Sequence, residues 1–244
     1  MTPLRYTRPM SSDAPVIEVS GLCRRFGRRW AFSQVDLTLQ RGEKLLVVGA
    51  NGSGKTTLLR VLSTILRPSQ GTLRLFGMDP REQPIAVRKR LALLSHHSGL
   101  YEDLSGRDNL QVVRRLGGYE AMDPGMLLET VGLDDRPDPI RAYSAGMRKR
   151  LQLATLLLQK PDLVLLDEPY AALDPAGVAD VIRLLGDLGA TLVVTSHRIA
   201  KAASMCDRAL LLGEGVPRWQ GPASDAVLAW STLHKDSHPA EVSA

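Results

Sequence analysis

The sequence predicts an α/β fold built on a mainly parallel sheet, and three short apolar runs carry this prediction. Residues 44–48, 163–166 and 191–195 read KLLVV, LVLL and TLVVT. Strands that are apolar on both faces suit a parallel sheet that is covered by helices, because neither face of such a sheet meets water. Helical runs with one apolar face alternate with these strands, which is the pattern of α/β proteins.

Two further regions predict an N-terminal antiparallel β subdomain and a helical lobe. Residues 17–19 and 32–39 alternate apolar and polar side chains, which is typical of antiparallel strands with one face in water. From about residue 100 to residue 159 the pattern turns mainly helical, with Asp, Pro and Gly gathered in the loops. We therefore expect a helical lobe over 100–159, inserted between the main strands.

The chain is expected to form one domain with a tail at each end. Its 244 residues, 44% hydrophobic and 23% charged, suit a single large α/β domain. The predicted boundaries are a disordered tail over 1–15, the domain over 16–230 and a flexible tail over 231–244. No apolar run approaches the roughly 20 residues of a membrane span, and the N-terminus lacks the apolar middle of a signal peptide.

Charge and cysteine content bear on the partner and the compartment. The 31 Lys and Arg against 26 Asp and Glu give a net charge of +5. This excess fits an anionic partner such as a nucleotide, a nucleic acid or a membrane surface, and it equally fits a solvated basic surface. Cys23 and Cys206 have neither the spacing of metal ligands nor that of a disulfide framework, which favours a reducing, cytoplasmic compartment.

A glycine-rich segment follows the first apolar strand. Residues 49–56 read GANGSGKT and match G-x-x-x-x-G-K-[ST] at every position, between a strand and a helix. Glycines let successive backbone N–H groups point at phosphate oxygens, and the helix adds its positive N-terminal end. Lys55 is expected to reach the β- and γ-phosphates, and the Thr56 hydroxyl to ligate Mg²⁺. The predicted binding residues for a nucleoside triphosphate are Gly49, Asn51, Gly52, Ser53, Gly54, Lys55, Thr56 and Thr57.

Acidic residues follow the second apolar strand, where an open parallel sheet binds its ligands. We expect Asp167 to hold Mg²⁺ through water and Glu168 to polarise the attacking water. His197 follows the third strand at the same edge, and we expect it to contact the γ-phosphate or that water. The sequence therefore predicts three candidate groups for triphosphate hydrolysis beside the glycine-rich loop.

With these motifs in place, the chain resembles the ATP-binding subunit of an ABC transporter from Val16 to about Gly221. The discriminating stretch is YSAGM at residues 143–147, which is similar to the family signature L-S-G-G-Q and departs from it at three positions. Ser144 and Gly146 are retained. Ser144 is also a good N-cap, and a helix start behind it offers N–H groups to an anion.

The resemblance implies a function and its partners. The cofactors would be ATP and Mg²⁺, and Phe26 would stack on adenine. Two nucleotide-binding domains would close face to face, so that Ser144 and Gly146 complete the site of the opposite subunit and Asp174 communicates across the dimer. The subunit would power separate integral membrane permease subunits at the cytoplasmic face of the inner membrane, and no nucleic acid partner is expected.

Two adjacent histidines stand at residues 96 and 97. The resemblance puts His96 where most members carry a Gln that joins the catalytic core to the helical lobe and senses Mg²⁺ and the attacking water. A catalytic and coupling role for His96 is therefore favoured over a metal or haem site. With a His at this position, the chain also resembles the haem-exporter branch of the family, which is associated with cytochrome c maturation. Imidazole donates or accepts hydrogen bonds as an amide does, and it also titrates near neutral pH.

Several alternatives stay open from the sequence. The exporter could carry a drug, a lipid or a polysaccharide instead of haem. A soluble ABC protein of nucleic-acid biology usually carries two cassettes or a long coiled coil, and the sequence has neither. A phosphotransferase of the kinase type fits the signature and the paired carboxylates poorly. A non-catalytic nucleotide sensor fits poorly too, because the predicted hydrolytic groups are all retained.

Overall fold

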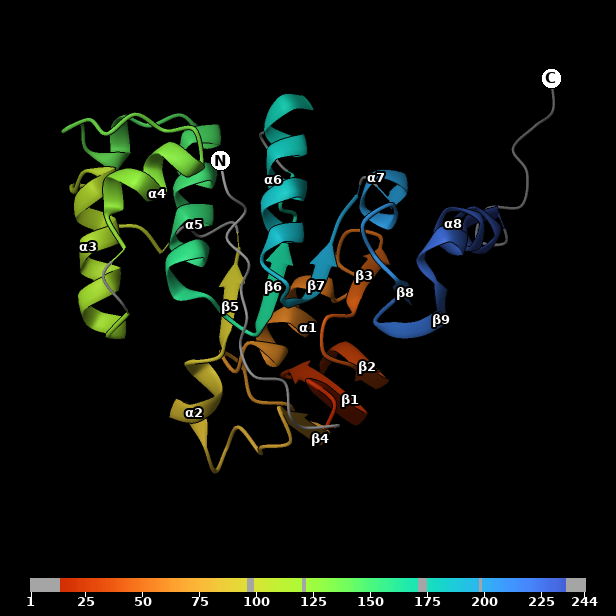
Figure 1. Ribbon diagram of the computed structural model, residues 1–244. Coiled ribbons are helices and arrows are strands. Elements are labelled where there is room, and N and C mark those ends of the chain that lie inside the picture. Colours follow the sequence, from red (N-terminus) through yellow and green to blue (C-terminus); the bar gives the residue numbers. More distant parts are fainter. Residues whose placement is uncertain (1–13, 96–98, 120–121, 171–174, 198, 236–244) are drawn as a thin grey trace, which may run out of the picture.

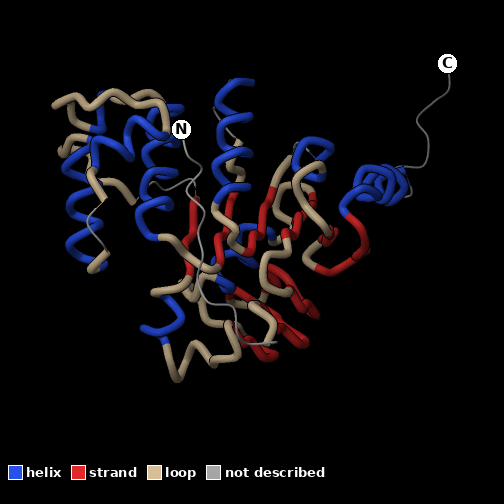
Figure 2. Tube along the Cα trace, viewed as in Figure 1, coloured by secondary structure: helices blue, strands red, loops and turns tan. Residues whose placement is uncertain are grey.

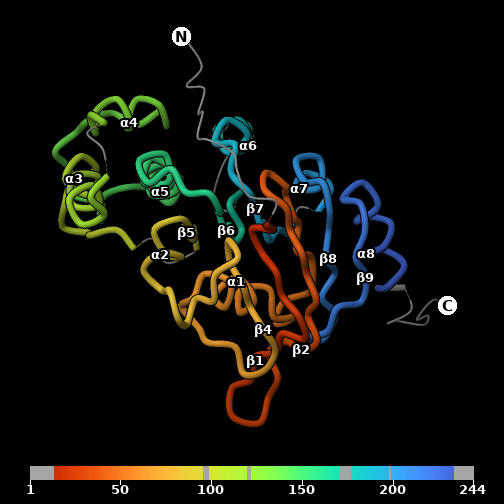
Figure 3. Tube along the Cα trace, turned by 60° about the horizontal axis from the view of Figure 1, so that its bottom comes forward, coloured from red at the N-terminus to blue at the C-terminus, as the bar shows by residue number. Residues whose placement is uncertain are grey.

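The computed structural model describes residues 14–95, 99–119, 122–170, 175–197 and 199–235. Its strands form two sheets, and a group of helices stands beyond one edge of the larger sheet (Figure 1). A view turned by 60° shows the same order, with the helices between residues 106 and 159 on the side of strand 91–94 and with the helices over 199–203 and 226–235 on the side of strand 208–213 (Figure 3). The molecule therefore has a sheet core with a helical lobe at one end.

The smaller sheet is antiparallel, as the alternating pattern predicts. Its strands lie in the order β2-β1-β4, with Ile17 paired to Leu39 on one side and to Leu75 on the other. Along the first residues of β1 buried and exposed side chains alternate, because one face covers the core and the other faces water. The strands are β1 (Ile17–Phe26), β2 (Arg29–Leu39) and β4 (Gln70–Leu75).

The larger sheet has six strands in the order β5-β6-β7-β3-β8-β9, and all neighbours except β8 and β9 are parallel. Every residue of β6 and β7 is buried, so the prediction of a parallel sheet covered on both faces is confirmed. The strands are β3 (Lys44–Gly49), β5 (Leu91–Leu94), β6 (Leu163–Asp167), β7 (Thr191–Thr195), β8 (Arg208–Gly213) and β9 (Val216–Pro222).

Helices cover the large sheet and build the lobe (Figure 2). Those around the sheet are α1 (Lys55–Leu62), α2 (Pro84–Arg88), α6 (Pro175–Asp187), α7 (Ile199–Ala203), η2 (Ala223–Asp225) and α8 (Ala226–Lys235). The lobe contains α3 (Gly106–Gly117), α4 (Pro124–Thr130), η1 (Ile140–Ala142) and α5 (Ala145–Gln159), which confirms the helical character predicted for this stretch.

Alternate residues of each central strand face two separate apolar layers. Leu45 and Val47 of β3 pack with α1 and the small sheet. Leu46 and Val48 face the opposite side, in a layer that continues through Leu151 into the helical lobe. This period of two is what a strand buried on both faces requires. One continuous core therefore joins the strand ends to α5, which carries the signature residues.

The C-terminal helix α8 runs to Lys235, five residues past the predicted domain end at 230. Ala226 is buried. Trp230 and Leu233, which are about one helical turn apart on the same face of α8, both pack against the core. The apolar spacing therefore continues the helix into the stretch predicted as a tail. Within the described residues, no helix is long and apolar enough to cross a membrane.

Candidate functional site

The glycine-rich loop joins the end of β3 to the start of α1. Gly54, the N-cap of α1, has φ +97°, and a Cβ there would come within 2.3 Å of the Ala31 carbonyl oxygen. Only glycine adopts this conformation without strain and leaves room for that close approach. The loop is thereby held against β2, and the first N–H groups of α1 face out of the sheet edge.

Two polar side chains of the loop, Lys55 and Ser53, make no hydrogen bond to residues outside the loop within the described part of the chain. Lys55 is buried, and its Nζ donates to the carbonyl oxygens of Gly49 at 2.7 Å and Ala50 at 2.9 Å. Burial lowers the pKa of Lys55, while the charges of Glu168 and Asp167 raise it. The Ser53 Oγ is buried without any hydrogen-bond partner in the described structure. A buried unsatisfied hydroxyl beside a buried ammonium fits a site built to receive an anion.

Asp167 is the last residue of β6 and joins the loop to two strands. Its Oδ1 accepts hydrogen bonds from the Thr56 hydroxyl at 3.2 Å and from the Thr195 hydroxyl at 2.7 Å. Thr195 ends β7, the neighbour of β6, so the sheet order fixes this contact. A hydroxyl and a carboxylate oxygen within hydrogen-bond distance are ligands that suit Mg²⁺. The residues present therefore fit the metal that the sequence predicts.

Glu168 follows in a backbone conformation that L-residues rarely adopt. Its φ is +50°, and its N–H donates to the carbonyl oxygen (3.2 Å) and the hydroxyl (3.1 Å) of Thr195. The carboxylate accepts from the backbone N–H of His197 at 3.2 Å, and the His197 Nε2 lies 3.2 Å from its other oxygen. Such left-handed residues persist where surrounding contacts determine them, and they cluster at functional sites.

These groups line one cavity of about 490 Å³. Phe26, from the tip of β1, stands at its entrance half exposed, with the Arg24 guanidinium 4.6 Å from its ring centre. The cavity thus combines an aromatic side chain, a phosphate-binding loop and two carboxylates. Its lining residues are Phe26, Arg29, Trp30, Ala31, Asn51, Gly52, Gly54, Lys55, Thr56, Thr57, Asp167, Glu168 and His197.

Comparison with known proteins assigns the family. The sequence pattern of the family described as ABC transporter matches residues 32–171, more than half of the chain. The chain belongs to the ABC transporter family. The daunorubicin resistance ATP-binding protein DrrA3 of Streptomyces coeruleorubidus is 39% identical over 86% of this chain. The cytochrome c biogenesis ATP-binding export protein CcmA of Nitrosococcus oceani is 38% identical over 78% of it. The protein is therefore an ATP-binding subunit of this family and an ATPase.

The relatives differ in how much of their length is matched. This ABC subunit spans 69% of DrrA3, 63% of the daunorubicin/doxorubicin resistance protein DrrA of Streptomyces peucetius, and 89% of CcmA. A solved ATP-binding subunit of an ABC transporter matches with a TM-score of 0.80 and 23% identity, over 89% of this chain and 94% of that one. A dimeric ATP-binding cassette bound to ADP and Pi matches with a TM-score of 0.77 and 21% identity, over 85% and 98%. These likenesses confirm the fold.

The ABC signature residues lie outside the cavity. Ser144 caps α5, with its Oγ accepting from the Met147 N–H at 3.2 Å, which confirms the predicted N-cap. Neither Ser144 nor Gly146 belongs to the lining, and the loop residues Gly49 and Ser53 are buried and do not line it either. His96 and Asp174 fall outside the described residues, so their roles stay predictions.

Three lining residues of this ABC subunit were not predicted: Arg29, Trp30 and Ala31. They open β2, directly across the hairpin from Phe26, which pairs with Arg29. The Arg25 guanidinium lies 5.7 Å from the Trp30 ring centre, so two cation–π contacts stiffen this hairpin. The available signal was the stretch RRFGRRW at 24–30, in which arginines alternate with aromatic residues.

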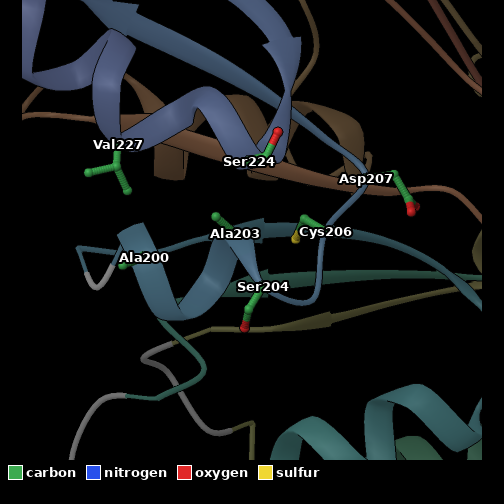
Figure 4. Close-up of a pocket in the computed structure, with 7 residues that line it drawn as sticks. All are labelled: Ala200, Ala203, Ser204, Cys206, Asp207, Ser224 and Val227. Carbon is green, nitrogen blue, oxygen red and sulfur yellow. The ribbon is translucent and has the colours of Figure 1, made fainter.

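A second cavity, of about 480 Å³, lies between α7 and α8 (Figure 4). Asp207 there accepts from the Lys44 N–H at 2.8 Å. Burial raises the pKa of Cys206 to about 12, so its thiol stays protonated at neutral pH and is a poor nucleophile. This cavity holds none of the residues predicted for nucleotide chemistry. Its lining is Ala200, Ala203, Ser204, Cys206, Asp207, Ser224 and Val227.

Proposed function

We propose that this chain hydrolyses Mg²⁺-ATP to drive export through separate membrane-spanning subunits. The observation that supports it most is the convergence of Lys55, Thr56, Asp167, Glu168 and His197 on one cavity with an aromatic rim. A cationic phosphate clamp, oxygen ligands and a water-orienting carboxylate are the parts that phosphoryl transfer needs. No covalent nucleophile is required.

Each side chain has a role that follows from its position. Lys55 exchanges its two carbonyl partners for the β- and γ-phosphates, and Ser53 donates its free hydroxyl. Thr56 and Asp167 would hold Mg²⁺, which supplies charge neutralisation at the phosphates when bound. Glu168 orients the attacking water, and His197 fixes the Glu168 carboxylate. Phe26 offers its exposed face to the adenine ring.

The active unit would be a dimer of two nucleotide-binding domains. Ser144 and Gly146 start a capped helix that offers N–H groups to an anion, and they lie outside the cavity of their own chain. A second copy that brings these residues over the first site would complete both sites at once. ATP then stabilises the dimer, because each bound nucleotide would contact both chains and so binds the dimer more tightly than the single chain. Asp174 would lie in that interface, and His96 would link the core to the lobe.

The membrane subunits, not this chain, would hold the transported molecule. Haem is the first candidate, since the export protein CcmA, named for cytochrome c biogenesis, is 38% identical and matched over 89% of its length. A drug is the second, since DrrA3, named for daunorubicin resistance, is 39% identical. The chain would then lie at the cytoplasmic face of the inner membrane, held there by its permease partners.

Reconstitution with the membrane subunits tests the proposal. The chain is co-purified with its membrane partners and placed in vesicles, and ATPase rate is measured with haem, with daunorubicin and without either. We expect one of them to stimulate hydrolysis and to accumulate in the vesicles, and Lys55→Ala to lose both signals. Hydrolysis that never responds to membrane subunits, with no accumulation of any cargo, would point instead to a soluble ABC protein.

A further inference from the structure

Arg24 lies in β1, two residues before Phe26, and its guanidinium covers one face of the Phe26 ring. The Arg24 Cζ is 4.6 Å from the ring centre, which is within the range of a cation–π contact. Residues two apart in a strand project from the same side of the sheet, so the two side chains can stack. Because Phe26 is 51% exposed, much of its ring has no packing neighbour, and the contact with Arg24 restrains its orientation.

Arg24 and the cavity meet the Phe26 ring on different sides. Phe26 lines the cavity of about 490 Å³, whereas Arg24 does not. An aromatic ring has two faces, and the guanidinium takes one of them. The other face is left for a planar ligand inside the cavity, such as a nucleobase. A bound base would thus place the ring between itself and the cation.

The Arg24 guanidinium is itself held in place. Its Nη1 donates to the Arg67 carbonyl oxygen at 3.0 Å. Its Nε is buried and makes no hydrogen bond in the described structure. An arginine side chain in water samples many rotamers, and a hydrogen bond together with burial removes that freedom. The ring therefore rests on a fixed group and not on a mobile surface side chain.

The carbonyl that anchors Arg24 belongs to the segment that follows the phosphate-binding helix. α1 begins at Lys55 and ends five residues before Arg67. The same segment is tied to β1 a second time, since the Ser69 N–H donates to the Cys23 carbonyl oxygen at 2.8 Å. The helix at the phosphate end of the cavity and the ring at its entrance are therefore linked through Arg24.

We propose that Arg24 is a positioning residue for the nucleotide: its guanidinium holds the Phe26 ring in the orientation in which the base stacks. The inference rests on the proposed stacking of adenine on Phe26, and it adds the group that fixes the ring from the other side. Without this contact an exposed ring samples other rotamers, and ordering it on binding lowers affinity. Phe26 is at the cavity entrance, away from the hydrolytic groups, so Arg24 acts on nucleotide affinity and not on the hydrolytic step.

Arg24→Met in the full chain tests the inference, with Arg74→Met as the matched control. Arg74 belongs to the same small sheet, and its guanidinium also donates to a backbone carbonyl oxygen, that of Gly77 at 3.4 Å. It pairs with Glu18, which is eight residues from Phe26 along β1, or about 26 Å of strand. The control therefore removes the same charge and the same kind of hydrogen bond far from the ring.

Steady-state rates at varied ATP concentration give kcat and KM, and inorganic tripolyphosphate, added as a competitor, probes the phosphate end alone. We expect Arg24→Met to raise the KM for ATP about fivefold, which corresponds to about 1 kcal/mol, and to keep kcat within about twofold of the parent. The inhibition constant of tripolyphosphate should stay within about twofold, because this competitor has no base to stack. Arg74→Met should match the parent in all three quantities.

A parent KM in Arg24→Met would overturn the inference. So would an equal weakening of tripolyphosphate, because it would assign the arginine to the phosphates or to the fold of the loop. In a Phe26→Ala background, Arg24→Met should raise the KM no further, and a full additional increase would show that Arg24 acts without the ring.

Phe26→Ala also separates this inference from the function on which it rests. If Phe26→Ala raises the KM while Arg24→Met leaves it unchanged, only the role of Arg24 fails. If Phe26→Ala itself leaves the KM unchanged, the stacking role of Phe26 fails and the inference fails with it.

Discussion

His197 approaches both oxygens of the Glu168 carboxylate. Its backbone N–H donates to one oxygen at 3.2 Å, and its Nε2 lies 3.2 Å from the other. The two residues follow neighbouring parallel strands, and Thr195 at the end of β7 also accepts from the Glu168 N–H. One carboxylate oxygen of Glu168 is thereby held by a hydrogen bond, while the other, Oε1, lies beside the imidazole and has no hydrogen-bond partner in the described structure. This arrangement depends on β6 and β7 being adjacent in the sheet.

Glu168→Gln should abolish hydrolysis and leave ATP binding intact. The amide keeps the shape and can still take the His197 N–H, but it no longer draws a proton from water. We expect kcat to fall by about 10²-fold or more, with ATP affinity within about threefold. In the same variant, light scattering should show a mass that doubles on adding ATP, since trapped nucleotide stabilises the dimer. A turnover rate equal to the parent's would exclude Glu168 as the water-orienting group.

His197→Ala should slow hydrolysis through Glu168 instead of through nucleotide affinity. The backbone N–H that binds one carboxylate oxygen survives this change, and only the imidazole contact is lost. We expect kcat to fall by about tenfold to a hundredfold, which is less than for Glu168→Gln. Steady-state rates and nucleotide titration on both variants check this. A larger effect on ATP affinity than on kcat would assign His197 to the phosphates.

Local patterns were sufficient to predict the strands, the glycine-rich loop and the end of β6. The spacing of Gly49, Gly54, Lys55 and Thr56 is set within eight residues, so short-range chemistry specifies it. The position of His197 beside Glu168 also followed from one general rule, that parallel strands place their carboxyl ends at one edge. These predictions needed no knowledge of how distant segments pack.

Contacts between segments that are distant in the sequence could not be predicted from local patterns. The bond from Thr195 to Asp167 depends on which strands are neighbours, and many strand orders fit the same runs. The inward turn of Lys149 depends on how α5 packs on the sheet, since a lysine between two arginines is usually solvated. Trp30 reaches the cavity because β1 and β2 pair as a hairpin. Each of these requires the tertiary fold.

Tyr143→Phe should stabilise the helical lobe. Tyr143 is 4% exposed, and its hydroxyl is buried without a hydrogen-bond partner in the described structure. Phe fills the same space without an unsatisfied polar group, so we expect the free energy of unfolding to rise by about 1 kcal/mol. Urea unfolding measures this, and Tyr101→Phe, at a half-exposed ring, serves as a control with a change below about 0.5 kcal/mol. Lower stability of Tyr143→Phe would mean that the hydroxyl has a partner after all.

The free energy of unfolding should depend on pH differently in the parent and in Lys149→Met. The pKa of Lys149 falls from 10.5 to about 8 on folding. Below pH 8 both the folded and the unfolded states bind the proton, so the full cost of the buried charge is present. Between pH 8 and 10.5 the folded state releases the proton while the unfolded state keeps it, so the parent's free energy of unfolding rises with pH.

Deprotonation of Lys149 raises the parent's free energy of unfolding by about 3 kcal/mol between pH 8 and 10.5, at 1.36 kcal/mol for each pKa unit. The raised pKa of Cys206 acts in the opposite direction above pH 9, because the unfolded thiol ionises first. Since Cys206 is common to both proteins, its effect cancels in their difference. We therefore expect the stability advantage of Lys149→Met to be largest near pH 7 and to shrink towards pH 10.5 in parallel urea titrations. Two curves that stay parallel across this range would show that the Lys149 ammonium is not held in an unfavourable buried position.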